Sequence, residues 1–212
     1  MTRLIFVRHG ESQANQLRLF AGSSNFALTE KGVAQAQATA QELKKYKIDA
    51  VYASDLQRAY YTGLAIAQSQ PCPIYKNSGL REISAGLWES CSFDTIAKDY
   101  PQMHTIWTQN IGRAILPQGE SVAQLYSRVK TAVMNIIDQN SGKTICLATH
   151  ATPIRAMEAV WNSRSYDHMQ KFPWVSNASI SVVDFDQGCW KVIVRGYNGH
   201  LGALNTELPK NI

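Results

Sequence analysis

The sequence predicts an α/β fold, a three-layer sandwich with helices on both faces of a mainly parallel central sheet. Short apolar runs typical of buried strands alternate along the chain with amphipathic segments of helical spacing. The chain has 212 residues, of which 45% are hydrophobic and 17% charged, as in globular proteins with a full core. We therefore expect one domain over residues 1–212, with a cap insertion at about residues 88–118.

The first predicted strand is the apolar run 4–7, which ends at Arg8, His9 and Gly10. In an open α/β sheet, ligands bind at the carboxyl ends of the strands. The planar guanidinium of Arg8 suits phosphate oxygens, and a histidine acts as nucleophile or proton carrier near neutral pH. Gly10 permits a sharp turn after the strand. Taken alone, the pair is also compatible with a strand end that meets solvent.

The next segments predict a loop, a helix and a second strand. Residues 16–27 lack periodicity, and Thr29 is suited to cap a helix. The apolar positions of that helix follow helical spacing: Val33, Ala36, Ala40 and Leu43. Residues 48–53 then predict the second strand.

A further helix is expected after that strand, capped by Ser54 and Asp55. Arg58 falls in its first turn, beside the positive end of the helix dipole. The residues expected to face the core are Leu64, Ile66 and Ala67. Residues 73–75 predict another strand, which leads into Glu82.

Residues 88–118 are predicted to be irregular. Aromatic residues alternate with polar ones there, and prolines and glycines interrupt the segment. This composition fits an insertion that covers one end of the sheet. Its aromatic side chains are core candidates, and some are candidates to contact an apolar leaving group.

Ser121 and Gln124 form a capping-box motif that predicts the start of a long amphipathic helix. The predicted inward residues of this helix are Val122, Leu125, Val129, Val133 and Ile136.

The last third of the chain predicts one more buried strand, a helix and a hairpin. The strand is the apolar run 144–148, and Thr152 and Pro153 suit the N-cap and first position of the helix that follows. Residues 180–185 and 190–194, separated by a turn segment, predict a terminal hairpin.

Composition argues against several classes of partner. The net charge is +5, from 21 basic and 16 acidic residues, but the densest basic cluster lies at residues 44–47. That cluster ends a predicted helix, where cations complement the helix dipole, so we expect no nucleic-acid partner. No apolar run reaches membrane-spanning length, and the run before Arg8 is too short for a signal peptide. We therefore expect no membrane association and a cytoplasmic location.

Cysteine and histidine spacing argues against a metal centre. The four cysteines are widely spaced, without a Cys-x-x-Cys pair, and no zinc-ligand spacing of histidines is present. We therefore expect no metal site, no cofactor and no disulfide framework. The oligomeric state stays open, with a homodimer as one option.

Four functional candidates lie where predicted strands end. His9 and His150 each follow a strand, and Arg8 and Arg58 lie at comparable strand-to-helix junctions. Since the carboxyl ends of parallel strands share one edge of a sheet, we expect these groups to converge. Such a cationic cluster repels itself unless an anion lies within it, and a phosphoryl group fits that position.

The motif Arg8-His9-Gly10-Glu11-Ser12, followed by Asn15, resembles the signature of the histidine phosphatase superfamily, the phosphoglycerate-mutase-like proteins. The resemblance recurs in order over residues 1–180. The other matching segments are Leu28-Thr29 with Gly32 and Gln35-Ala36, Ser54-Asp55-Leu56-Gln57-Arg58-Ala59 with Thr62, Leu80-Arg81-Glu82 with Gly86 and Trp88-Glu89, Gly119-Glu120-Ser121, Thr149-His150, and Asn177-Ala178-Ser179.

The resemblance implies a role for each candidate residue. His9 would be the nucleophile that takes the phosphoryl group as phosphohistidine. The groups that clamp the phosphoryl oxygens and stabilise the transition state would be Arg8, Arg58 and His150. Asn15 matches a position that lines the phosphate pocket, and Ala151 replaces a common glycine beside it. Glu82 matches the carboxylic acid that protonates the leaving oxygen and later activates water.

Within this family the sequence favours a metal-independent phosphomonoesterase acting on a small phosphorylated metabolite, of the broad-specificity or alpha-ribazole-phosphatase type. No segment matches the longer insertion of the mutases. The alternatives are a cofactor-dependent phosphoglycerate mutase and a non-catalytic protein that binds a phosphorylated ligand. The chain departs from the family pattern at Tyr61, Ser90 and Ala151, and at residues 25–27, but none of these removes a reacting group.

Overall fold

The computed structural model describes residues 1–207, which contain a six-stranded sheet with the order β3-β2-β4-β1-β5-β6. The strands are β1 (Thr2–Arg8), β2 (Ala50–Ala53), β3 (Ile74–Lys76), β4 (Thr144–Thr149), β5 (Ile180–Asp186) and β6 (Cys189–Tyr197). The neighbours β3, β2, β4 and β1 run parallel, whereas β5 is antiparallel to β1 and β6 to β5. The predicted mainly parallel sheet and terminal hairpin are confirmed.

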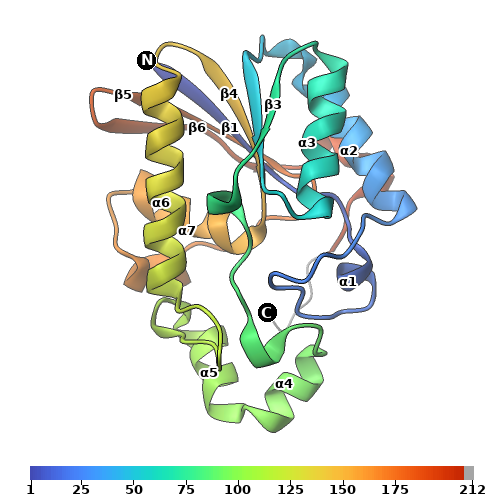
Figure 1. Cartoon of the computed structure of the whole chain (residues 1–212), viewed down its shortest axis with the longest axis vertical. Helices are drawn as coiled ribbons and strands as arrows, with labels where there is room; N and C mark the ends of the chain where they lie inside the picture. Colours follow the sequence, from blue (N-terminus) through green and yellow to red (C-terminus); the bar gives the residue numbers. More distant parts are fainter. Residues whose placement is uncertain (208–212) are drawn as a thin grey trace.

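Helices cover both faces of this sheet (Figure 1). The α-helices are α1 (Gln13–Gln16), α2 (Glu30–Glu42), α3 (Gln57–Ser69), α4 (Phe93–Asp99), α5 (Pro101–Gln109), α6 (Val122–Gln139) and α7 (Ala151–Trp161). Short 3₁₀ segments are η1 (Leu43–Lys45), η2 (Ser78–Leu80), η3 (Gly86–Trp88), η4 (Ile111–Arg113), η5 (Tyr166–Lys171) and η6 (Gly199–Leu204). In Figure 1, α2 and α3 lie on one side of the sheet and α6 and α7 on the other.

The three layers follow from the apolar character of β1. Successive side chains of a strand point to opposite faces of the sheet. Leu4 and Phe6 pack in a cluster with side chains of α6 and α7, whereas Ile5 and Val7 pack in a second cluster with side chains of α2 and α3. Because residues 4–7 place apolar side chains on both faces of β1, both faces are buried under helices.

The capping box at Ser121 is present, and the five predicted inward residues of α6 are buried. The start of α3 differs from the prediction, because neither Ser54 nor Asp55 caps it. Its N-cap is Leu56, which makes no side-chain capping bond. The two polar side chains are used elsewhere: Oγ of Ser54 lies 2.8 Å from Nε2 of His150, and Asp55 pairs with Arg81.

The start of α7 also differs from the prediction. The helix begins at Ala151 with His150 as its N-cap, so Thr152 and Pro153 lie inside the first turn. A proline is tolerated there because the first amides of a helix have no intrahelical acceptor.

Two side chains expected in the core are not fully buried: Val33 is 46% exposed and Leu64 is half-buried. The buried residues of α2 are Gly32, Gln35, Ala36, Thr39 and Ala40. The polar side chains Gln35 and Thr39 can lie inside because they are hydrogen-bonded to residues of other segments, Glu11 and Ala178.

Residues 88–118, predicted to be irregular, contain α4 and α5 instead. The aromatic residues drive this order: the ring of Phe20 lies 5.5 Å from that of Trp88 and 5.1 Å from that of Trp107. Both tryptophans are buried in the main cluster. In Figure 1, α4 and α5 lie at the lower end of the molecule, away from the N-terminus.

Among residues 1–207, none of the helices combines the length and apolar character needed to span a bilayer.

Candidate active site

His9 and His150 follow the neighbouring parallel strands β1 and β4 at the same edge of the sheet. Arg8 pairs with Thr149 at the end of their shared register, so the next residues lie side by side. The two imidazole centroids are 5.1 Å apart, with 60° between the ring planes. The side chains are almost fully buried, with 4% and 0% exposed. The structure therefore brings together the two histidines that the strand pattern predicted to converge.

The geometry around His9 selects one tautomer. Nδ1 lies 2.7 Å from the carbonyl oxygen of Gly10, and since a carbonyl only accepts, Nδ1 carries the proton. Burial, together with the charges of Arg58 and Arg8, holds the pKa of His9 well below its ordinary value. The neutral ring with a lone pair on Nε2 is therefore the stable form.

Backbone carbonyls hold the two arginines. Nη1 of Arg8 donates to the carbonyl of Val175 at 2.6 Å. The guanidinium of Arg58 donates to the carbonyls of Ser24 and Gly22, each at 2.7 Å. Burial lowers the pKa of both guanidinium groups to about 10, so both stay cationic at neutral pH. Carbonyl partners fix the side chains without neutralising them, and the positive charge remains available to an anion.

His150 completes the cluster. Its Nε2 lies 2.8 Å from the hydroxyl of Ser54. Burial and the charge of Arg58 hold its pKa well below the ordinary value. Within residues 1–207, Nδ1 of His150 and the Nε atoms of Arg8 and Arg58 are buried without a hydrogen-bond partner. Unpaired buried polar groups are costly, and an oxyanion between them would supply acceptors.

Asn15 lies in α1, directly after the first motif, and its amide orientation is defined. Its Oδ1 accepts from the backbone N–H and the hydroxyl of Ser12, both at 3.0 Å, and from Nδ2 of Asn177 at 3.1 Å. Because these three donors point at Oδ1, the NH₂ group is the other end of the amide and carries its donors. Nδ2 of Asn177 also donates to the carbonyl of His9 at 3.1 Å. Asn177, 2% exposed, thus links the two residues.

Ala151 is the first residue of α7, so its amide belongs to a helix N-terminus next to His150. The first amides of a helix lack intrahelical acceptors and carry the positive end of the dipole, which favours an anion. Replacing glycine by alanine leaves this backbone donor in place.

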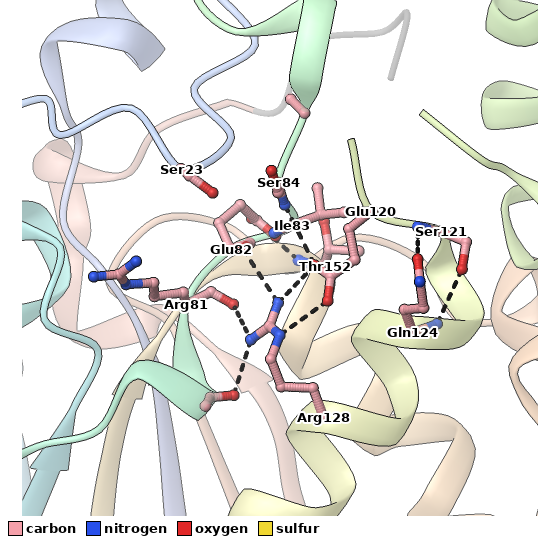
Figure 2. A network of polar contacts seen from close by, with 12 residues as sticks. Ser23, Arg81, Glu82, Ile83, Ser84, Glu120, Ser121, Gln124, Arg128 and Thr152 are labelled. Atoms are coloured by element: carbon pink, nitrogen blue, oxygen red, sulfur yellow. Dashed lines mark hydrogen bonds and ion pairs between the residues drawn. The ribbon is translucent and has the colours of Figure 1, made fainter. Parts of the chain in front are cut away.

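Glu82 lies in the loop after η2, close to the cationic cluster. Its charge raises the pKa of both Arg8 and Arg58 against the effect of burial. Oε1 accepts from the amide of Ile83 at 2.9 Å, and Oε2 from that of Thr152 at 3.4 Å. The bond to Thr152 therefore holds Glu82 at the N-terminus of α7, the helix whose N-cap is His150. Figure 2 shows Glu82 and Thr152 close together.

Sequence reasoning assigned no site role to Glu89, yet its carboxylate organises the loop that holds Arg58. Oε1 accepts from the amides of Ser23 and Ala85, both at 2.8 Å. Oε2 accepts from the amide and the hydroxyl of Ser24, at 2.8 and 2.5 Å. Glu89 belongs to the matching segment Trp88-Glu89, and Asn177 belongs to Asn177-Ala178-Ser179. Membership of these segments was the sequence signal that could have identified both residues.

Gly10 allows a close approach between two backbone segments. Its φ is outside the left-handed region, and a Cβ at this position would overlap the backbone carbonyl of Gly32. The close approach of these two glycines places α2 against the end of β1.

In residues 1–207 no group of three or more His, Cys, Asp and Glu side chains is arranged to hold a metal ion.

Comparison with known proteins agrees with this geometry. The family model of the histidine phosphatase superfamily (branch 1) matches residues 4–197. Phosphoserine phosphatase 1 of Hydrogenobacter thermophilus is 30% identical over 212 residues, covering 100% of both chains. The probable phosphoglycerate mutase GpmB of Escherichia coli O1:K1 / APEC is 30% identical over 196 residues, covering 90% of this chain and 88% of that protein.

Solved structures show the same fold. The structure titled Bacillus stearothermophilus YhfR superposes with a TM-score of 0.90 at 29% identity, covering 95% of this chain and 100% of that one. The family match spans both histidine-bearing strands and the terminal hairpin. The chain belongs to the histidine phosphatase superfamily, branch 1.

Proposed function

We propose that this protein is a metal-independent phosphomonoesterase that acts through a phosphohistidine on His9. The observation that carries the proposal is a neutral imidazole whose Nε2 lone pair lies in a cluster with Arg8, Arg58 and His150. Each of these three has a buried nitrogen without a hydrogen-bond partner in residues 1–207. A nucleophile with several cationic or donor groups close to it suits a phosphoryl group, whose charge spreads over its oxygens in the transition state.

In the first step Nε2 of His9 attacks phosphorus and the bond from phosphorus to the ester oxygen breaks. Glu82 gives its proton to that oxygen, which leaves as an alcohol. In the second step water attacks phosphorus and Glu82 takes a proton from the water. The bond from phosphorus to Nε2 breaks, orthophosphate leaves, and His9 regains its lone pair. The arginines, His150, Asn15 and the amide of Ala151 hold the phosphoryl oxygens throughout, so no metal ion is needed.

The substrate is a small phosphorylated metabolite. Because the full-length relative is a phosphoserine phosphatase, phosphoserine is the first compound to test. Residues 88–118 would act as the cap over the leaving group. Trp88 and Trp107 are buried in the hydrophobic core, so they are not available to stack on a substrate.

The main test is a rapid-quench experiment with ³²P-labelled substrate. We expect acid-labile, base-stable label on the protein, which disappears in the variant His9→Ala. Persistent label in that variant would reject His9 as nucleophile. The absence of both label and phosphate release from nitrophenyl phosphate would favour the non-catalytic alternative.

The similarity to a probable phosphoglycerate mutase keeps mutase activity as the second candidate. With 3-phosphoglycerate and the bisphosphate primer, we expect phosphate release to exceed formation of 2-phosphoglycerate. The reverse ratio would assign the protein to the mutases.

A further inference from the structure

The loop that carries Glu82 is not held by secondary structure. η2 ends at Leu80, and η3 begins at Gly86. Backbone carbonyls that are not paired in a helix or sheet need other donors. The carbonyl of Leu80 accepts from the hydroxyl of Thr149 at 2.6 Å. The neighbouring carbonyls accept from the side chain of Arg128, which reaches them from α6.

The guanidinium of Arg128 uses all of its donors at this place. Nη1 donates to the carbonyls of Gly79 and Arg81, at 3.0 and 3.1 Å. Nη2 donates to the carbonyl of Glu82 at 3.4 Å and to Oε2 of Glu120 at 2.8 Å, and Nε donates to Oε1 of Glu120 at 2.9 Å. These bonds account for the five N–H groups of an arginine. Figure 2 shows the guanidinium between the loop and Glu120.

Glu120 holds the other side of the loop. Its Oε2 accepts from the amide of Ser84 at 3.3 Å, and its own amide donates to the carbonyl of Ser84 at 2.8 Å. The ion pair of Arg128 and Glu120 therefore fixes the backbone both before and after Glu82. The motif Gly119-Glu120-Ser121, to which the proposed mechanism assigns no role, supplies Glu120, the acidic partner in this ion pair.

We propose that Arg128, supported by Glu120, is a positioning residue that places the Glu82 carboxyl group for proton transfer to the leaving oxygen. This rests on the proposed function, in which Glu82 is the acid. Within residues 1–207 the Glu82 side chain accepts bonds only from the amides of Ile83 and Thr152, so its location depends on the backbone beneath it. Arg128 is no phosphate ligand, because its five donors are occupied.

Displacement of the Glu82 carboxyl group should slow the phosphorylation step by different factors for different leaving groups. An alkoxide needs a proton in order to leave, whereas a nitrophenolate leaves without one. Displacement of a reacting group by about 1 Å can cost roughly a hundredfold in rate. Loss of Arg128 should therefore slow the reaction of alkyl phosphates selectively. A lysine cannot restore the arrangement, because its three donors lack the planar fork.

The test compares single-turnover phosphorylation of His9 by an alkyl phosphate and by nitrophenyl phosphate. Arg128→Met keeps an unbranched side chain about as long as the aliphatic stem of arginine and removes the donors. Arg3→Met is the matched control, since it removes another two-pronged arginine–carboxylate pair, with Asp184, at the start of β1. For Arg128→Met we expect about ten- to a hundredfold loss with the alkyl phosphate. With nitrophenyl phosphate we expect no more change than in the control.

A double variant separates positioning from general structural damage. In a Glu82→Gln background, Arg128→Met should cause no further selective loss, because both changes act through the same carboxyl group. Equal loss on both substrates, or a full selective loss in that background, would overturn the role of Arg128. If Arg128→Met does not fold, Arg128→Lys carries the same comparison. Failure of the wild-type protein to phosphorylate His9 would instead reject the proposed function.

Discussion

Nδ1 of His9 donates a hydrogen bond to the carbonyl of Gly10, its direct neighbour in the chain, across 2.7 Å. This contact determines which ring nitrogen carries the proton and which one keeps its lone pair. It does so without a carboxylate, so no negative charge raises the pKa of the ring from this side. Burial and the two arginines then keep His9 neutral.

The first prediction concerns the protonation of the buried histidines. Because the pKa values of His9 and His150 are held well below ordinary ones, neither ring should take up a proton between about pH 7.5 and 5.5. In histidine-labelled protein observed by NMR, the imidazole signals of His9 and His150 should not titrate in this range, whereas they should titrate in the urea-unfolded chain. Titration of His9 near pH 6.5 would contradict the burial argument.

The same shift makes stability depend on pH. Above pH 6.5 a histidine is neutral in the folded and the unfolded chain, whereas below it only the unfolded chain gains the proton. The free energy of unfolding should thus fall with falling pH, by about 1.4 kcal/mol per pH unit for each such histidine. Urea unfolding of His9→Asn should show a shallower fall than the wild type. An unchanged slope would exclude His9 as a contributor.

The second prediction is that Glu82→Gln loses activity selectively. Glutamine keeps the shape but cannot give up a proton in the same way. General acid catalysis contributes roughly a hundred- to ten-thousandfold, so phosphorylation by an alkyl phosphate should fall by that order and by nitrophenyl phosphate far less. Single-turnover rates are compared, because the proposed mechanism uses Glu82 in dephosphorylation as well. Equal losses would assign Glu82 to binding.

The third prediction is that Glu89→Gln weakens the hold on Arg58. In the variant, the NH₂ group of glutamine replaces one carboxylate oxygen of Glu89 and faces backbone N–H groups. Since both are donors, the hydrogen bonds to that oxygen are lost. A hydrogen bond to a charged group contributes about 1.5–3 kcal/mol, so unfolding free energy should fall by about this amount. Inhibition by orthophosphate should weaken in parallel. The exposed Glu30, changed to glutamine, is the control. Intact phosphate affinity in Glu89→Gln would mean that Arg58 does not depend on this loop.

The fourth prediction is that chelation leaves turnover unchanged, because the guanidinium groups supply the positive charge that a metal would otherwise provide. Initial rates with and without EDTA, after dialysis against the chelator, measure this. Activity lost in EDTA and restored by magnesium or zinc would argue against the proposed mechanism.

Much of the arrangement could be read from the sequence because it depends on local patterns. Apolar runs that end in His9 and His150 predict strands with their functional residues at one edge, and parallel pairing then brings the two rings together. The capping box at Ser121 and the inward face of α6 are local in the same sense, since the helical period relates residues only a few positions apart.

Other features were decided by contacts between distant segments. Ser54 looked like a helix cap, but its hydroxyl meets His150, 96 residues away, and α3 starts later. Asn177 reaches Asn15 across 162 residues, and Arg128 reaches the loop of Glu82 from another element. A polar side chain takes whichever partner the folded chain places within hydrogen-bond distance. The sequence alone therefore determined the fold class and which groups are candidates to react. Only the tertiary structure determined which partners hold and orient those groups, because a hydrogen bond depends on distances that no local period encodes.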